Sequence, residues 1–404
     1  MEEKKLIPKR RFEGFEGDWY KNKLKNLASF SKGRGYSKND IKNRGTELLL
    51  YGSLYTSYQT IVDKVNVYTK KKPNSVLSNG EEVVVPSSGE TKEDIARASA
   101  IVKSGIIIGG DLNIIQPTEE LNSVFLALEI SNGSSQQELI RRAQGSAVVH
   151  LYNDDLKSVV IYYPDLKEQQ KIGKFFRVLD ERIANQERKI AKVKALKEAY
   201  LAEMFPQEGE TVPKRRFKGF EGKWRKKKLG DFGTVEMNKR IFKWQTTEEG
   251  DVPFYKIGTF GKKPDSFIPY ELFQKYKQKY PYPQVGDLLI SASGSIGKIV
   301  EYTGKDEYFQ DSNIVWLKHD GKLNNLFLKQ FYNIVKWGNL EGSTIQRLYN
   351  KDILETPIVV PPTIKEQQKI GAFFKNLDDQ IEAEEAKLEK LKQMKEAYLE
   401  EMFV

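Results

Sequence analysis

The chain contains two copies of one long segment, each at the end of otherwise dissimilar sequence. Residues 167–205 and 365–403 both begin KEQQKIG, and they end KEAYLAEMF and KEAYLEEMF. A shorter segment precedes each copy, as PKRRFEGFEGDW from Pro8 and PKRRFKGFEGKW from Pro213. Because the repeated landmarks enclose unlike sequence, this duplication predicts one framework that carries two different globular heads.

Each long repeat has the pattern of a coiled-coil helix. Asp165 and Thr363 each lie three residues before a glutamate (Glu168 and Glu366), which is the form of a capping box. Apolar residues then recur at intervals of four and three, and Pro206 ends the first helix. At 1.5 Å per residue, each helix extends roughly 58 Å. The predicted seam consists of Ile172, Phe176, Leu179, Ile183, Ile190, Val193, Tyr200, Ile370, Phe374, Leu377, Ile381, Leu388, Leu391 and Tyr398.

The charges of the two helices favour pairing with each other. Residues 181–199 have a surplus of Lys and Arg, whereas residues 379–397 have a surplus of acids. An antiparallel arrangement is predicted to place Glu382, Glu384 and Glu385 near Lys192, Lys194 and Lys197. Such rim pairs select partner and orientation, and a polar seam residue (Gln186 in one copy, Glu384 in the other) fixes the register. The alternative is that each helix pairs with its equivalent in another chain.

The heads have the pattern of mixed α/β domains. Short β-branched and aromatic runs at 82–85, 288–291, 314–317 and 357–360 predict strands, and 122–131 and 323–337 predict helices. The expected fold class is α+β, with two mixed α/β domains joined by two long antiparallel coiled-coil helices in a pseudo-twofold repeat. The expected divisions are 1–164 and 213–362 for the heads, 165–205 and 363–404 for the helices, and 206–212 for the linker.

Composition limits the compartment and the chemistry. Lys and Arg number 66 against 56 acids, for a net charge of +10, which favours polyanionic partners. The absence of cysteine excludes disulfides and thiolate metal sites. No apolar run approaches the ~20 residues of a membrane span, and MEEKKLIPKRR lacks the apolar core of a signal peptide. We therefore expect a cytoplasmic protein.

The residues that catalysis requires are scarce. The two histidines, His150 and His319, have no second metal ligand at a usual spacing, so no metal site is expected. The segment 294–298 (GSIGK) has the wrong glycine spacing for a phosphate loop and is expected to be a turn. The triplet 385–387 (EAK) resembles part of a nuclease motif but lies within a predicted helix. The chain is predicted to be non-catalytic on its own.

Basic clusters with interleaved polar and aromatic residues indicate nucleic-acid binding in both heads. Lys and Arg neutralise phosphates, while Arg, Gln, Ser and Thr also contact base edges in the major groove. Each cluster taken alone is also typical of an ordinary solvated loop, but clusters occur in both heads. The predicted DNA-binding residues are Lys32, Arg34, Tyr36, Lys38, Tyr55 and Ser57 in the first head, with Lys239, Arg240, Lys256, Lys262, Lys263, Ser343, Thr344, Gln346 and Arg347 in the second.

These motifs together resemble the specificity subunit of a Type I restriction-modification system, over nearly the whole chain. The resemblance is carried by the twin KEQQKIG helices, by GSTIQRLYN at 342–350, and by YKIGTFG, GDLLISASGSIGK and YFQDSNIVW at 255–261, 286–298 and 308–316. The first head departs from the pattern, with GSAVVHLYN at 145–153. If residues 344–347 contact DNA in the second head, the first head cannot make identical contacts. The alternative is that these residues are structural and close the head onto the long helix.

The resemblance implies two target-recognition domains, each of which binds one half of a bipartite double-stranded DNA sequence in host defence. It implies that the two helices set the gap between half-sites and dock two modification subunits that methylate adenine at N6. Restriction subunits would then join the complex. S-adenosylmethionine, ATP and Mg are expected on those partners, with no cofactor on this chain. The remaining alternatives are a structural coiled-coil adaptor with basic heads and no sequence preference, and a self-contained nuclease or methyltransferase.

Overall fold

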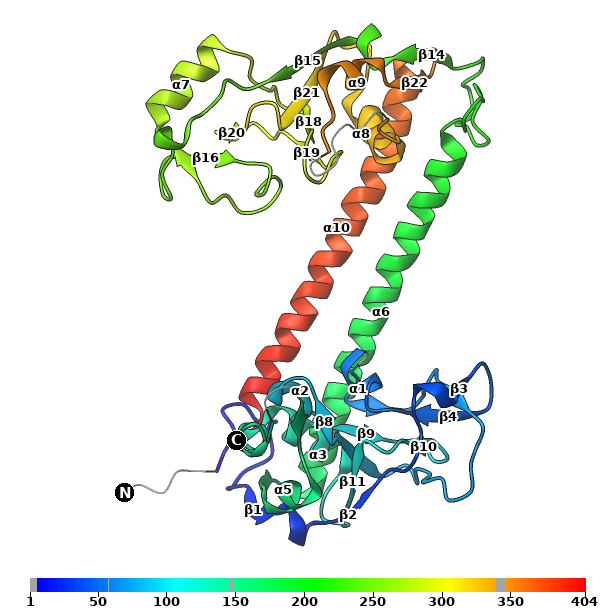
Figure 1. The fold of residues 1–404 in the computed structure, drawn as a ribbon, viewed down its shortest axis with the longest axis vertical. Coiled ribbons are helices and arrows are strands. Elements are labelled where there is room, and N and C mark those ends of the chain that lie inside the picture. Colours follow the sequence, from blue (N-terminus) through cyan, green and yellow to red (C-terminus); the bar gives the residue numbers. More distant parts are fainter. Residues whose placement is uncertain (1–5, 57, 146–147, 339–345) are drawn as a thin grey trace. The chain divides into compact units, whose positions relative to one another are not determined.

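The computed structural model describes residues 6–56, 58–145, 148–338 and 346–404. It divides into two compact units, one comprising residues 1–187 with 386–404 and the other comprising residues 188–385. Each unit holds one head together with one part of both long helices (Figure 1). The divisions expected from the sequence assigned each head and each long helix to its own segment of the chain. The two compact units are divided differently, because each long helix contributes apolar residues to the cores of both units.

A five-stranded sheet organises the first head, in the order β2-β11-β7-β9-β5. Its strands are β2 (Ala28–Lys32), β11 (Leu112–Pro117), β7 (Glu82–Pro86), β9 (Ser99–Ile101) and β5 (Ile61–Val62). β11 is antiparallel to β2 and β7, and β5 runs parallel to β9. Every residue of β7 is buried, which explains its run of valines, since a strand covered on both faces carries apolar side chains throughout.

Helices α3 (Ser123–Asn132) and α4 (Ser134–Arg142) cover one face of this sheet, where Val83 and Val85 contribute to the largest core of the unit. Val84 points to the opposite face and packs in a second core with Leu49. The α3 helix starts at the cap Asn122, whose side chain accepts a hydrogen bond from Phe125 N at 3.1 Å.

A smaller sheet packs on that second face and supports the loops of the first head. Its order is β10-β4-β6-β3, with β10 (Ile107–Ile108), β4 (Thr46–Leu49), β6 (Tyr68–Thr69) and β3 (Ile41–Lys42). The 3-10 turn η2 (Lys38–Asp40) precedes β3. The remaining short elements are α1 (Ser53–Thr56), α2 (Lys92–Ile95), α5 (Asn153–Ser158), β8 (Ser88–Gly89) and β12 (Val149–His150).

The second head repeats the main sheet with different surroundings. Its four strands follow the order β15-β21-β18-β19, with β15 (Gly233–Met237), β21 (Ile314–His319), β18 (Leu288–Ser291) and β19 (Ile299–Glu301). A three-stranded sheet follows the order β17 (Phe267–Ile268), β16 (Val252–Tyr255) and β20 (Tyr308–Phe309). The other elements are η4 (Lys243–Gln245), α7 (Tyr270–Lys279), α8 (Asn325–Ile334) and α9 (Asn350–Glu355).

The strands predicted at 82–85, 288–291 and 314–317 are present in these sheets, and the one predicted at 357–360 pairs with 225–228 in a separate two-stranded ribbon. The predicted helices need small corrections. The helix expected at 122–131 is α3. The helix expected at 323–337 is shorter, because Asn324 caps α8 and Val335 adopts an extended conformation.

A two-stranded ribbon at the base of each head leads directly into a long helix. In the first head β1 (Tyr20–Lys23) pairs with β13 (Val160–Tyr163), and in the second β14 (Arg225–Lys228) pairs with β22 (Pro357–Val360). The 3-10 turns η1 (Leu24–Asn26) and η3 (Leu229–Asp231) follow β1 and β14.

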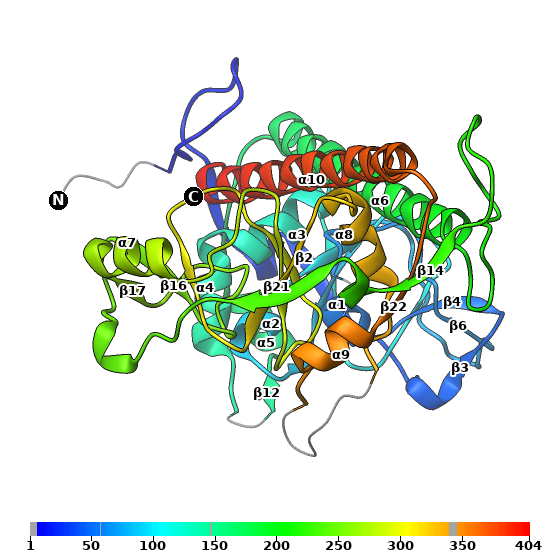
Figure 2. The ribbon, with the colours of Figure 1, turned by 90° about the horizontal axis from the view of Figure 1, so that it is seen from above.

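The long helices are α6 (Leu166–Met204) and α10 (Ile364–Glu401), and they run antiparallel within each unit (Figures 1 and 2). Each of the predicted seam residues is buried or half-buried. The two helices make an equivalent aromatic contact in each unit: the ring centroids of Phe175 and Tyr398 lie 4.9 Å apart, and those of Phe373 and Tyr200 lie 5.1 Å apart. The helices thus pair by the seam that their heptads predicted.

The antiparallel orientation agrees with the predicted charge selection, although most partners differ from those expected. Lys194 pairs with Glu385 at 2.7 Å. Lys197 pairs instead with Asp378 at 2.6 Å, and Glu384 pairs with Lys189 at 2.9 Å. The stagger of the helices, in which Phe175 meets Tyr398 and Phe373 meets Tyr200, decides which charges meet.

The repeated PKRRF segments anchor the heads to the helices by a contact that recurs in each unit. Arg11 makes a two-pronged ion pair with Glu168, with nitrogen–oxygen distances of 2.8 and 2.7 Å. Arg216 pairs in the same way with Glu366, at 2.7 and 2.8 Å. Both carboxylates are buried, with side chains 1% exposed. The capping residues Asp165 and Thr363 do accept bonds from Glu168 N and Glu366 N, but the glutamate side chains bind arginine instead of completing a capping box.

Candidate nucleic-acid interface

In both heads, loops that are distant in sequence meet at one end of the main sheet. Because β11 runs antiparallel between β2 and β7, its first residues lie beside the last residues of both neighbours: Asn113 opposes Lys32, and Leu112 opposes Pro86. The second head has the same arrangement around the start of β21, where Ile314 opposes Ser291. The predicted basic residues at the end of β2 and after β15 therefore share this end with the residues that lead into β11 and β21, at 109–111 and 310–313.

In the second head, the loop 311–313 gathers two of the predicted arginines. Arg240 Nε lies 2.8 Å from Asp311 Oδ2. Asn313 Oδ1 accepts hydrogen bonds from Ser293 Oγ at 2.7 Å and from an Arg347 amine at 3.3 Å. Ser312, between them, has a φ of 54°, which places it in the left-handed region. Arg240 and Arg347 thus lie at one loop, and Gln346 is exposed beside Arg347.

Within the part of the chain that the structure describes, some of the lysines predicted to bind DNA in the second head already interact with other side chains, and others do not. Lys256 pairs with Asp265 at 2.8 Å, and Lys239 Nζ lies 5.2 Å from the centre of the Tyr280 ring. Lys262 and Lys263 are exposed, and no acidic partner for either is found among the described residues. These two ammonium groups are therefore the ones most available to a phosphate backbone.

In the first head, Lys32, Arg34 and Lys38 are exposed, and close loop packing presents them. Gly33 N donates to Leu112 O at 3.0 Å, and Arg34 N donates to Ile108 O at 3.2 Å. A Cβ on Gly33 would lie 1.9 Å from the carbonyl oxygen of Gly109, so only glycine allows this approach.

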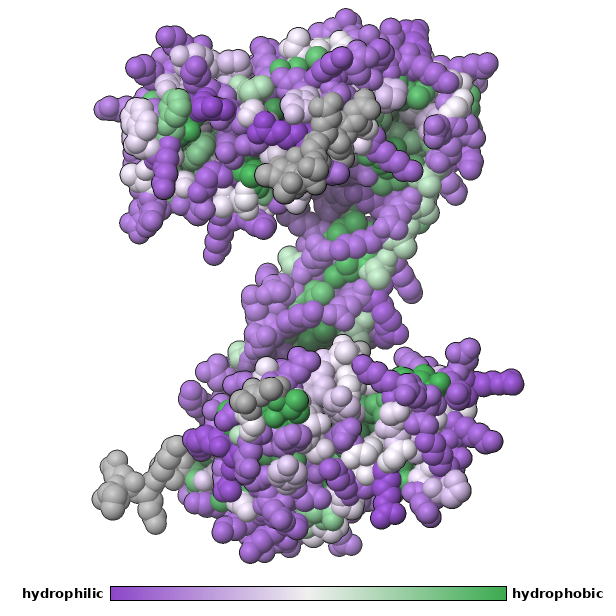
Figure 3. Space-filling view, in the orientation of Figure 1, coloured by the Kyte–Doolittle hydropathy of each residue, from purple (hydrophilic) through white to green (hydrophobic). Residues whose placement is uncertain are grey.

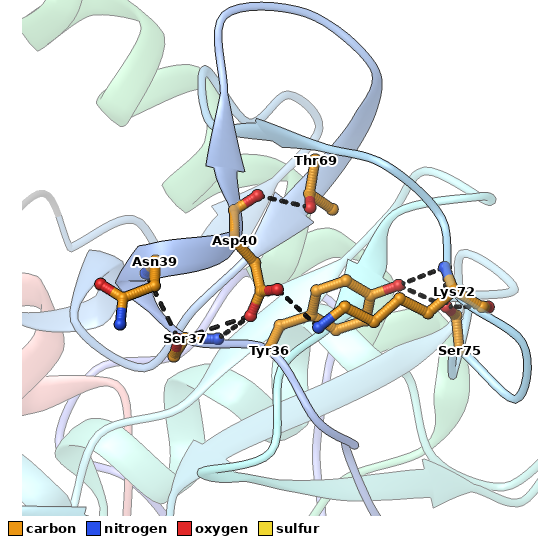
Figure 4. A network of polar contacts seen from close by, with 7 residues as sticks. All are labelled: Tyr36, Ser37, Asn39, Asp40, Thr69, Lys72 and Ser75. Atoms are coloured by element: carbon orange, nitrogen blue, oxygen red, sulfur yellow. Dashed lines mark hydrogen bonds and ion pairs between the residues drawn. The ribbon is translucent and has the colours of Figure 1, made fainter.

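Tyr36, in the same segment, was predicted to bind DNA, but the structure gives it a structural role. Its side chain is only 8% exposed, and its hydroxyl lies 2.5 Å from Ser75 Oγ and accepts from Lys72 N at 2.7 Å (Figure 4). Lys72 Nζ also lies 4.7 Å from the ring centre and pairs with Asp40 at 2.5 Å. Asp40 accepts from Ser37 N as well, and Lys72 and Ser37 together lower the pKa of the Asp40 carboxyl. The network fixes the η2 turn and leaves the Tyr36 ring little surface for a base.

Tyr55 has a supporting role of the same kind. Its hydroxyl donates to Ser88 O at 2.6 Å and lies against Gly89, and burial raises the pKa of this hydroxyl. It therefore holds the loop after β7 in place, and its hydroxyl is already engaged there. Ser57, Ser343 and Thr344 lie outside the described residues.

The segment 294–298 forms a turn, as expected, with Lys298 N bonded to Ser291 Oγ at 2.8 Å and Lys298 Nζ bonded to Phe260 O. Within the described ranges, no group of three or more His, Asp or Glu side chains is placed to hold a metal ion. No helix among those residues has the length and apolarity to cross a bilayer.

Comparison with known proteins decides the family. A model of the Type I restriction modification DNA specificity domain matches residues 16–195 and 221–393. The chain belongs to this family. A putative type I restriction enzyme specificity subunit of Haemophilus influenzae strain Rd is 58% identical over 147 residues, which are 36% of this chain and 38% of that protein.

Solved structures of Type I systems have a similar fold. The S subunit of the Type I restriction-modification system from M. genitalium superposes with a TM-score of 0.67 at 16% identity, over 99% of both chains. A chain from a study of complex assembly and conformational transition of the type I R-M system gives 0.53 at 18% identity, over 95% of this chain and 97% of that one. At 16% and 18% identity, this similarity shows that the chain shares the fold of these proteins, but it does not show which DNA sequence the chain recognises.

Sequence reasoning missed the arginines that join the heads to the helices. Arg10 and Arg215 lie 5.1 and 5.2 Å from the ring centres of Tyr398 and Tyr200, and they pair with Glu401 and Glu203. The signal was present, because PKRRF occurs twice at the same place in the repeat. However, three of these four arginines pair with glutamates that are more than a hundred residues away in the sequence. A local sequence pattern cannot predict such partners.

Proposed function

We propose that this chain is the sequence-reading subunit of a cytoplasmic Type I restriction-modification complex, and that it recognises a bipartite DNA target with one half-site per head. The observation that carries the proposal is the contrast between frame and loops. The same buried Arg–Glu anchor occurs in both units, whereas the loops at the end of each main sheet differ in residue and partner. A duplicated frame with unlike loops suits the recognition of two unlike half-sites.

The long helices are proposed to set the gap between the half-sites. Half-sites on a duplex lie at a fixed rise and angle, so a reader of two of them needs a spacer of defined length. α6 and α10 contain 39 and 38 residues and pair through an apolar seam. Helices paired over that length have the stiffness that a spacer requires.

The same helices offer equivalent surfaces to two copies of one partner, which we propose to be the modification subunits. Leu166 and its equivalent Ile364 are 39% and 38% exposed, and Leu196 and its equivalent Met394 are 45% and 37% exposed. Figure 3 shows apolar side chains on the outer surface of these helices. Apolar side chains left in solvent at positions related by an internal repeat suit two identical partners. Restriction subunits would join this assembly, and S-adenosylmethionine, ATP and Mg would bind the partners.

Mapping N6-methyladenine across the genome of a host that expresses this chain with its modification and restriction partners tests the proposal. We expect methylation at one bipartite motif, with two specified halves and a constant unspecified gap. A host that expresses the partners without this chain is the control and should lack that motif. Methylation at a single continuous motif, or an identical pattern in the control, would contradict the proposal.

A further inference from the structure

Each head projects one 3-10 turn, and the tips of the two turns differ in chemistry. η2 follows β2 and η4 follows β15 at the same spacing, so Lys38 corresponds to Lys243 and Asn39 to Trp244. The turns are therefore one structural element of the duplicated frame. Its tip carries an exposed amide in the first head and an exposed indole in the second.

The η4 turn is held by its own hydrogen bonds. Phe242 N donates to Gln245 Oε1 at 3.0 Å, and Gln245 N donates to Phe242 O at 2.9 Å. Thr246 Oγ1 closes the turn by donating to Lys243 O at 2.8 Å.

Both ends of this turn are fixed to the head. On one side Ile241 packs in the core of the three-stranded sheet, and Arg240 pairs with Asp311. On the other, Thr247 exchanges backbone hydrogen bonds with Phe267 of β17, at 3.0 and 2.9 Å. The turn is thus presented in one conformation, which lowers the entropy cost of binding through it.

Two large aromatic rings on this fixed turn face solvent. Trp244 is 81% exposed and Phe242 is 50% exposed, and their rings are nearly parallel, at 7° and 6.3 Å between centroids. By contrast, Trp19, Trp224 and Trp316 are 2%, 2% and 1% exposed. Trp244 therefore contributes little to the core, and an exposed aromatic pair on a rigid turn is typical of a binding surface.

The surroundings of this aromatic pair are suited to a polyanion that carries stacking surfaces. Lys243 lies on the same turn, and Lys239 precedes it. A hollow of about 870 Å³ adjoins the turn. Its lining includes Phe242, Lys243 and Gln310, together with Glu248 and with Lys256, which pairs with Asp265. Cations with aromatic rings on one surface are the combination by which proteins bind phosphates and bases together.

We infer that Trp244, supported by Phe242, is a DNA-contacting wedge that stacks on bases of the second half-site. The inference rests on the proposed function. An apolar side chain that enters a base step partially unstacks it, and Lys243 beside it neutralises a phosphate. In the first head, Asn39 at the equivalent position carries an amide suited to hydrogen bonds with a base edge. One element of the frame thus serves two half-sites by different chemistry.

The test uses this chain assembled with its modification subunits and a duplex that contains both half-sites, as defined by methylation mapping. Trp244→Ala is expected to raise the Kd roughly 10- to 100-fold, the loss typical of one stacked base. Trp244→Phe should keep most of the affinity. Tyr270→Ala, which removes a ring that is 48% exposed on α7, is the matched control and should leave the Kd unchanged.

Fluorescence gives a second measurement. Because Trp19, Trp224 and Trp316 are buried and Trp337 is half-buried, Trp244 should give the largest share of the quenching by acrylamide. Binding of the cognate duplex should protect this indole from acrylamide and quench its emission, and Trp244→Phe should lack both changes. A duplex with a scrambled second half-site should produce neither change in the wild type.

The outcomes separate this inference from the proposed function. An unchanged Kd for Trp244→Ala, with the thermal unfolding midpoint of the wild type, would overturn the wedge and leave bipartite recognition standing. Loss of the modification subunits from Trp244→Ala in size-exclusion chromatography would also overturn it, because the turn would then bind protein. If the wild-type complex does not distinguish the scrambled duplex from the cognate one, both the wedge and the proposed function are wrong.

Discussion

Lys189 Nζ lies 2.9 Å from Glu384 Oε1, and the side chain of Glu384 is only 8% exposed. The repeat does not reproduce this ion pair, whereas it does reproduce two other pairs between the helices. Lys197–Asp378 recurs as Lys395–Asp180, and Lys194–Glu385 recurs as Lys392–Glu187. The equivalents of Glu384 and Lys189 are Gln186 and Lys387, which cannot form a carboxylate–ammonium pair. A buried charge at one seam position thus distinguishes the two helices.

Reversing the charge at Glu384 should destabilise the helix pair far more than reversing its exposed neighbour. Glu384→Lys places a second cation at the buried seam opposite Lys189, at an expected cost of roughly 3–5 kcal/mol. Glu385→Lys, the control, removes an ion pair whose carboxylate is 48% exposed and should cost roughly 0.2–1 kcal/mol. Urea unfolding followed by circular dichroism measures both. If both variants lost the same free energy of unfolding, burial of Glu384 at the seam would have no effect on the stability of the helix pair.

Removing either member of the Arg11–Glu168 pair should destabilise the first unit strongly. Glu168→Ala leaves a guanidinium that is only 13% exposed without its carboxylate, and we expect a loss of roughly 3–5 kcal/mol. Arg11→Lys should rescue little, because lysine cannot make the two parallel bonds seen at 2.8 and 2.7 Å. Hydrogen exchange should locate the loss at β1, β13 and the start of α6. A loss below about 1 kcal/mol in thermal unfolding would contradict a structural role for this anchor.

The buried carboxyl of Glu129 should make the first head less stable as pH rises. Burial raises the pKa of Glu129 to about 8, and its Oε2 atom has no hydrogen-bond partner within the described part of the chain. A carboxyl whose folded-state pKa is raised contributes fully below its unfolded value and loses that contribution as pH increases toward the folded value. Between about pH 4.5 and 8 the loss should approach roughly 3–5 kcal/mol at full ionisation.

Thermal unfolding at pH 5 and pH 9 distinguishes this site from general alkaline sensitivity. The wild type should show a lower midpoint at pH 9, and Glu129→Gln should remove most of the difference. Glu138→Gln, on the neighbouring helix α4 where Glu138 pairs with Arg142, is the control and should keep the wild-type dependence. A Glu129→Gln profile parallel to the wild type would show that this carboxyl does not titrate in that range.

Lys262 and Lys263 should contribute affinity for DNA without sequence preference. Each phosphate contact that is lost lowers the slope of log K against log salt by about 0.9. Lys262→Ala with Lys263→Ala in the assembled complex should therefore reduce that slope by up to about 1.8 and weaken cognate and scrambled duplexes alike. Lys318→Ala, whose ammonium already pairs with Glu236 at 3.1 Å, is the control. A change confined to the cognate duplex would instead indicate contact with base edges.

The framework was predictable from the sequence because its pattern is local and repeated. Apolar residues at intervals of four and three position each seam residue without knowledge of the partner helix, and Pro206 ends the first helix within two residues of Met204. The charge surplus of each helix also predicted the orientation. The individual pairs were less predictable, because the stagger of the helices decides whether Lys189 or Lys192 meets Glu384, and the heptad pattern does not give that stagger.

The roles of side chains in the heads were harder to predict, because their partners come from remote segments. Tyr36 lies among basic and polar residues, which predicted a DNA contact. Its hydroxyl is instead bonded to Ser75 and Lys72, which lie on a loop more than thirty residues away. Arg11 and Glu168 are separated by 157 residues. The exposed indole of Trp244 carries no periodic signal either, and only the fold shows that it is outside the core.

Exchange of residues 20–160 with the corresponding head of another family member, followed by mapping of N6-methyladenine in the host, tests the central claim most directly. Two independent readers on one spacer predict that the half-site read by the first head changes, while the other half-site and the length of the gap are unchanged. A change in both halves, or in the gap, would contradict the assignment of one half-site to each head.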